Sequence, residues 1–135
     1  MQTKFSQDQL VEPDIAVAND ILRKCVHCGF CMATCPTYVL LGDESDSPRG
    51  RIYQIREMLE SGNTVSVASV KHIDRCLSCL SCMTTCPASV NYMHLVDLAR
   101  TRIDKTYERP VAERFLRRLL AIVIPNPRIF QLSLI

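Results

Sequence analysis

The feature that most constrains this chain is a cysteine pattern that occurs twice. Each block reads Cys-x2-Cys-x2-Cys-x3-Cys-Pro, over residues 25–36 and again over residues 76–87. Corresponding cysteines are 51 residues apart, and the two blocks hold all 8 cysteines of the 135-residue chain. A chain of this length can bury a core without crosslinks. The cysteines therefore call for a chemical explanation, not one based on stability.

This spacing is the one by which bacterial-type ferredoxins hold cubane iron–sulfur clusters. Three thiolates at intervals of three residues reach three irons of one cube, and in two-cluster ferredoxins the fourth iron takes the last cysteine of the other block. The pattern thus predicts two [4Fe-4S] clusters with crossed ligands. One cluster is expected on Cys25, Cys28, Cys31 and Cys86, and the other on Cys76, Cys79, Cys82 and Cys35.

Two other uses of eight cysteines are weighed against the clusters. Zinc takes four ligands arranged as cysteine pairs, which leaves the third cysteine of each block and the Cys-Pro ending unexplained. A disulfide scaffold is typical of secreted chains, but residues 1–10 are polar and contain no apolar signal-peptide segment. We therefore expect metal ligation in a reducing, cytoplasmic compartment.

Composition narrows the function further. The formal net charge is only +2, which does not indicate a nucleic-acid partner. The most apolar stretch, residues 119–135, is interrupted by Pro125, Pro127 and Arg128, so no membrane-spanning helix is expected. The chain has 4 glycines and no Gly-x-Gly-x-x-Gly motif, so no nucleotide or flavin site is expected.

Apolar residues recur at helical spacing in most of the chain, and no pair of strands is evident. Helices are predicted over residues 14–24, 47–61, 92–107 and 110–124. Residues 64–70 fit either a strand or a helix, of which we favour a helix from Ser66, and residues 37–41 are expected as a short apolar turn. The predicted fold class is all-α, a helical two-cluster ferredoxin domain with cysteine-rich loops.

The predicted domain organisation has three parts. Residues 1–13 form an N-terminal tail, residues 14–109 the cluster-binding domain, and residues 110–135 a C-terminal helix with an apolar tail.

Several motifs carry a resemblance to a known family. They include Cys35-Pro-Thr-Tyr38, Leu41-Gly-Asp-Glu44 and Ser47-Pro-Arg-Gly-Arg-Ile52. With them, roughly residues 20 to 130 resemble the iron–sulfur subunits of bacterial glycolate oxidase, in the 2-hydroxy-acid dehydrogenase family. Family members are longer and continue into a domain with Cys-Cys-Gly motifs, so we expect this chain to be truncated before that domain.

The resemblance implies an oxidoreductase role without a substrate site on this chain. A separate flavin subunit would oxidise glycolate or D-lactate, and this subunit would relay the electrons to a quinone-linked acceptor. The alternatives are a sibling dehydrogenase, such as one for glycerol-3-phosphate or lactate utilisation, and a cluster-stabilised interaction or sensing module.

Two groups of arginines keep two interpretations each. Arg49 and Arg51 lie either near a cluster or partner, or on a solvated first helical turn. Arg114, Arg117 and Arg118 flank an apolar helical face, which fits docking on a partner protein. The same helix also fits peripheral contact with the cytoplasmic face of the inner membrane.

Overall fold

The computed structural model describes residues 1–62 and 65–132, a part of the chain that includes all the cysteines. Within these residues the regular structure is entirely helical, which confirms the all-α fold class. The elements are α1 (Gln7–Leu10), α2 (Pro13–Lys24), η1 (Phe30–Met32), α3 (Pro36–Leu41), η2 (Glu44–Asp46), α4 (Pro48–Glu60), α5 (Val67–Asp74), α6 (Ser81–Thr84), α7 (Tyr92–Thr106), α8 (Val111–Val123) and α9 (Pro127–Leu132).

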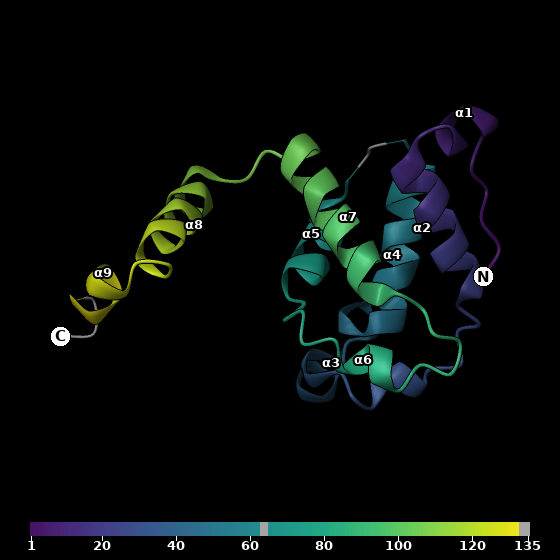
Figure 1. The fold of residues 1–135 in the computed structure, drawn as a ribbon, viewed down its shortest axis with the longest axis horizontal. Coiled ribbons are helices and arrows are strands. Elements are labelled where there is room, and N and C mark those ends of the chain that lie inside the picture. Colours follow the sequence, from purple (N-terminus) through teal and green to yellow (C-terminus); the bar gives the residue numbers. More distant parts are fainter. Residues whose placement is uncertain (63–64, 133–135) are drawn as a thin grey trace.

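The core is formed by four amphipathic helices, α2, α4, α5 and α7, which pack against one another (Figure 1). Each helix turns its apolar stripe inward, as the 3.6-residue periodicity predicts. The largest fully buried apolar side chains are Leu22, Ile55, Leu59, Ile73, Leu95, Val96 and Ile103. The cysteine loops lie beyond one end of this bundle, beside α3 and α6 (Figure 1).

Helix starts follow from capping residues that are visible in the sequence. The Ser47 side chain accepts a hydrogen bond from the Gly50 amide at the start of α4, and Pro48 occupies the first helical position. Ser66 caps α5 in the same way, which confirms the helix favoured over a strand there. Thr64, part of that ambiguous segment, lies outside the described residues.

Three segments differ from expectation in detail. Residues 37–41 form α3 where a turn was expected, because Pro36 opens the helix and Gly42 closes it in the left-handed conformation at φ 68°. The N-terminal segment contains α1, and Phe5 packs against the core. The apolar tail includes α9, and its last residues, 133–135, lie outside the described part.

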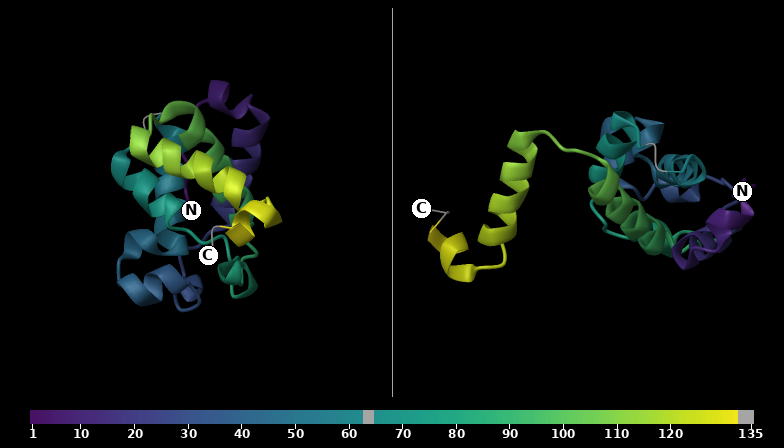
Figure 2. Two further views of the ribbon diagram at one scale, coloured as in Figure 1. Left: turned by 90° about the vertical axis from the view of Figure 1, so that its left-hand side faces the viewer. Right: turned by 90° about the horizontal axis from the view of Figure 1, so that it is seen from above.

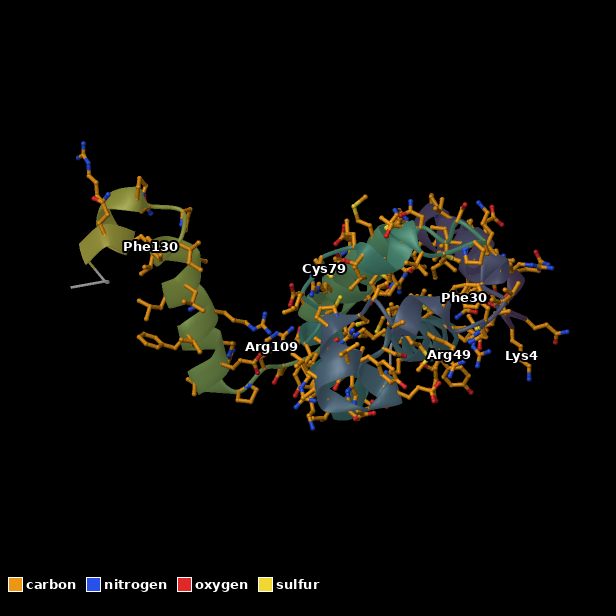
Figure 3. All side chains as sticks on the ribbon, turned by 90° about the horizontal axis from the view of Figure 1, so that it is seen from below. Lys4, Phe30, Arg49, Cys79, Arg109 and Phe130 are labelled. Atoms are coloured by element: carbon orange, nitrogen blue, oxygen red, sulfur yellow. The ribbon has the colours of Figure 1, made fainter. Side chains whose placement is uncertain are left out.

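Helices α8 and α9 extend away from the bundle as an arm (Figures 1 and 2). Helix α8 buries none of its residues. Its base is held by Arg109, which donates to Asp74 at 2.6 Å and to Glu113 at 2.8 Å (Figure 3). Arg117 adds a bond to Asp74 at 2.9 Å. None of the described helices is long and apolar enough to cross a bilayer.

Candidate metal centre

The two cysteine blocks form loops with the same backbone conformation. In each loop the residues just before and just after the second cysteine are left-handed. They are His27 (φ 54°) and Gly29 (φ 85°) in the first loop, and Ser78 (φ 52°) and Leu80 (φ 59°) in the second. Residues other than glycine seldom adopt this conformation. Its recurrence at equivalent positions indicates one shared loop structure, of the kind that curls backbone N–H groups around an anion.

The cysteines line two cavities. The first contains Cys25, Cys28, Cys31, Cys82 and Cys86 in its wall. The second is lined by Cys35, Cys76, Cys79 and again Cys82. The last cysteine of each block thus lies with the first three of the other block, which agrees with the crossed ligand sets. Ligation itself stays a prediction.

The two cavities are neighbours. Pro48 and Tyr92 line both of them, as does Cys82. The blocks are also joined directly, because η1 packs on α6 and the hydroxyls of Thr34 and Thr85 lie 3.3 Å apart. Groups held in the two cavities would therefore be separated by little more than shared side chains.

The spacing of the sulfurs separates a cubane from a zinc site. Four thiolates bound to one zinc at about 2.3 Å lie about 3.8 Å from one another. Among the described residues, which include every cysteine, no three Sγ atoms all lie within 4.8 Å of each other. All the cysteines are free thiols. A cubane takes each thiolate on a separate iron and so holds its sulfurs farther apart than one zinc ion does, which agrees with the absence of such a close group of sulfurs among the described residues.

Burial controls the protonation of the thiols before metal binds. Burial raises the pKa of Cys82 to about 12 and also raises the pKa of Cys31. The exposed Cys79 has a lowered pKa, chiefly because the Ser81 amide donates to its sulfur. Thiolate is the form that ligates iron. Loading of the site must therefore release protons from the buried cysteines.

Three hydrogen-bond donors outside the Cys-x2-Cys-x2-Cys segments contact cysteine sulfurs. The Tyr92 hydroxyl donates to Cys76 Sγ at 3.5 Å, and the Val90 amide donates to Cys86 Sγ at 3.5 Å. Burial raises the pKa of Tyr92 well above its usual range, so the hydroxyl keeps its proton. Hydrogen bonds of this kind are a main control on cluster potential.

The third donor is Arg51, whose Nη1 lies 3.8 Å from Cys35 Sγ. Arg51 is only 1% exposed, so the solvated interpretation is wrong for this residue. Arg49, two positions earlier, is partly exposed and forms an ion pair with Glu44. Sequence reasoning missed Asp46, which is fully buried and receives hydrogen bonds from Arg51 at 3.2 Å and Arg75 at 2.9 Å.

Residues 21–90 match the family of 4Fe-4S dicluster domains, a segment that contains both cysteine blocks. The chain belongs to this family. As a 4Fe-4S dicluster domain, it has cofactors of the [4Fe-4S] type.

Two relatives make the resemblance narrower. The chain is 50% identical over 131 residues to the glycolate oxidase iron-sulfur subunit of Escherichia coli, covering 97% of this chain and 32% of that protein. It is 34% identical over 98 residues to a probable glycolate oxidase iron-sulfur subunit of Bacillus subtilis, covering 72% of this chain and 22% of that protein. These matches confirm the resemblance inferred from the motifs. No solved structure matches the chain.

Proposed function

We propose that this dicluster domain binds two [4Fe-4S] clusters on the crossed ligand sets and relays single electrons between a flavin subunit and a quinone-linked acceptor. The observation that carries the proposal is the pair of adjacent cysteine-lined cavities with Cys82 in both walls. The chain spans about a third or less of the length of the relatives it matches, 32% of one and 22% of the other.

Ligand chemistry favours electron relay over substrate chemistry. Four cysteines per cluster fill the protein-facing position of every iron, so no iron keeps an open site for a substrate. A cubane supplies one-electron redox chemistry when bound. What the chain contributes is a fixed short separation between two such groups and the hydrogen bonds from Tyr92, Val90 and Arg51.

The circuit rests on the relatives, whose names place them in glycolate oxidase. Oxidation of a 2-hydroxy acid such as glycolate or D-lactate releases an electron pair, and a one-electron carrier must take the electrons singly. A flavin subunit would accept this electron pair and pass the electrons on one at a time. The proposed location is the cytoplasm, with Arg114 and Arg118 of the α8 arm available for peripheral contact with an anionic membrane surface.

The first experiment measures iron and acid-labile sulfide per chain on anaerobically purified protein. We expect about eight of each, as two cubanes require. Low-temperature EPR after dithionite reduction should then show a spectrum broadened by two interacting S = 1/2 centres. Zinc in place of iron, with no reducible signal, would contradict electron transfer and leave a structural module.

The second experiment tests the circuit. The loaded domain is mixed anaerobically with a catalytic amount of a glycolate-oxidising flavin subunit, and the visible cluster absorbance is followed after glycolate is added. We expect bleaching with glycolate or D-lactate. A domain that dithionite reduces but the flavin subunit does not would favour a sibling dehydrogenase or a sensing role.

A further inference from the structure

The first turn of α4 presents one arginine to each cavity. Arg49 lines the first cavity and Arg51 lines the second, with Pro48 forming a wall of both. The cysteine loops occur twice, but this turn occurs once and contributes to the walls of both cavities. A difference in burial or charge pairing between the two arginines therefore makes the surroundings of the two cavities different.

Arg51 is held in a fixed buried position. Its Nε donates to the His72 carbonyl at 2.7 Å, and its Nη1 donates to Thr37 Oγ1 at 3.1 Å. The same Nη1 reaches Cys35 Sγ, and the Thr37 hydroxyl lies 3.2 Å from that sulfur. The guanidinium thus places both a positive charge and a hydrogen bond at one predicted ligand of the second cluster.

Arg51 shares its buried carboxylate partner with two other side chains. Asp46 is the buried carboxylate of this network, and it also receives bonds from Arg75 at 2.9 Å and from the His72 ring at 3.0 Å. Asp43 is near His72 and Asp46 as well, but it is exposed and screened by solvent. Arg75 is 41% exposed and is screened in the same way, but among these charged side chains Arg51 is the one whose bond to Cys35 Sγ is found in the described residues.

Arg49 differs from Arg51 both in its exposure to solvent and in its contacts with the cysteine sulfurs. Its side chain is 28% exposed, and it pairs directly with Glu44. Its Nη1 contacts the His27 carbonyl at 3.4 Å, and no bond from it to a sulfur is found among the described residues. In the first cavity the neutral Val90 amide donates to Cys86 Sγ, and the Met1 ammonium donates to the carbonyl of Cys25 and not to its sulfur.

We infer that Arg51 raises the reduction potential of the cluster on Cys76, Cys79, Cys82 and Cys35, and makes it the resting place of the first electron that enters the domain. The inference rests on the proposed function. A cubane with four thiolates carries about −2 when oxidised and gains one further negative charge on reduction, without forming or breaking a bond. A nearby buried cation stabilises the reduced form more than the oxidised form.

The experiment is a potentiometric titration of the full chain, with dithionite as the one-electron reductant and EPR as the readout. Arg51→Gln is expected to shift the reduction equilibrium of one cluster by about tenfold toward the oxidised form, which is about 59 mV for one electron. Arg51→Lys keeps the charge, so its reduction potential should stay close to that of the wild type. The matched control, Arg49→Gln, should leave that potential in place.

Two further variants test the direction of the potential shift and identify the cluster that is reduced first. Asp46→Asn removes the opposing charge and should shift the same cluster the other way, which remains measurable if Arg51→Gln fails to load. Cys79→Ser changes the spectrum of its own cluster and so shows which one is reduced first.

Three results would overturn the role of Arg51. They are unmoved potentials in loaded Arg51→Gln, an equal shift of both clusters, and first reduction of the cluster unaffected by Cys79→Ser. Each of these leaves electron transfer standing, because both clusters are then present and reducible. A wild-type chain without a reducible signal would overturn the inference and the proposed function together.

Discussion

At the scale of single residues, the central question is which sulfurs share a cluster. Spacing alone predicts the crossed sets, and the cavities bring Cys35 beside the second block and Cys86 beside the first. Among the residues that adjust the site, the sequence places Arg51 near a cluster in one of two interpretations, but it does not indicate Asp46. Asp46 lies in a segment that reads as an acidic loop, and its pairing with Arg51 depends on a turn and a helix start meeting in space.

Cys35→Ser should damage the cluster built mainly on Cys76, Cys79 and Cys82, because the substitution removes its fourth ligand. We expect the EPR signal of that cluster to be lost or altered while the other persists. Cys86→Ser is the matched variant, and it should spare the Cys76 cluster and damage the one on Cys25. Loss confined to the cluster of the variant's own block would refute crossed ligation.

At the scale of elements, the long helices were predictable and the short ones were not. Helices α4, α5 and α7 begin at residues with side-chain caps and continue an apolar stripe, and both signals are local. Helix α3 spans six residues, Pro36–Leu41, too few for periodicity to separate a helix from a turn. The left-handed Leu80 could be found only by comparing its loop with the first block, where glycine occupies the equivalent position.

Gly50 gives an element-scale prediction that opposes helix propensity. It lies inside α4, where alanine normally stabilises a helix by about 1 kcal/mol relative to glycine. Here an added Cβ would lie 2.0 Å from the Glu44 carbonyl oxygen in the η2 backbone. Gly50→Ala should therefore lower the free energy of unfolding by about 3 kcal/mol, the upper range for overpacking.

The measurement for Gly50→Ala is chemical denaturation followed by circular dichroism, on protein loaded under identical conditions. Glu57→Ala is the control on the same helix, because Glu57 is exposed. It should change stability by less than about 0.5 kcal/mol. A Gly50→Ala protein as stable as the wild type would mean that η2 moves freely away from α4.

At the scale of the whole molecule, the bundle and the arm are joined by a small ionic contact. Arg109 binds Asp74 and Glu113, and Arg117 binds Asp74 (Figure 3 shows Arg109 at the base of the arm). The side-chain bond to Asp74 is the main reason that the pKa of Arg109 is raised. Arg109 is buried, so its pair with Asp74 is shielded from solvent, whereas the Arg117 side chain is 48% exposed and its pair contributes little.

Asp74→Asn should loosen the arm without unfolding the bundle, because the neutral amide can no longer pair with both arginines. We expect faster proteolysis within residues 107–110 and unchanged thermal unfolding of the core. Asp104→Asn is the control, because that carboxylate is exposed and its contact with Arg109, at 3.4 Å, is longer than the contact made by Asp74. Equal cleavage rates in the two variants would show that Asp74 does not anchor the arm.

The exposed apolar face of the arm predicts self-association. Phe115, Leu116, Leu119 and Leu120 are each more than 40% exposed on α8, and contiguous apolar surface of this kind promotes contact between molecules. Sedimentation velocity over a range of concentrations should show oligomers that Leu119→Glu reduces. Arg118→Gln, which changes the net charge by the same one unit at the neighbouring position, should reduce them less.

The first turn of α4 gives the molecule a means of adjusting two nearly identical sites separately. Two identical cysteine loops alone would give two clusters of equal reduction potential, and an electron would then have no preference for either cluster. Pro48 lines both cavities, Arg49 lines the first and Arg51 lines the second. A change at one of the arginines can therefore alter the potential of one cluster without replacing a predicted metal ligand. On the proposed function, a short unduplicated segment would then decide which of the two clusters holds the electron, and reversing that preference would require only a few substitutions there.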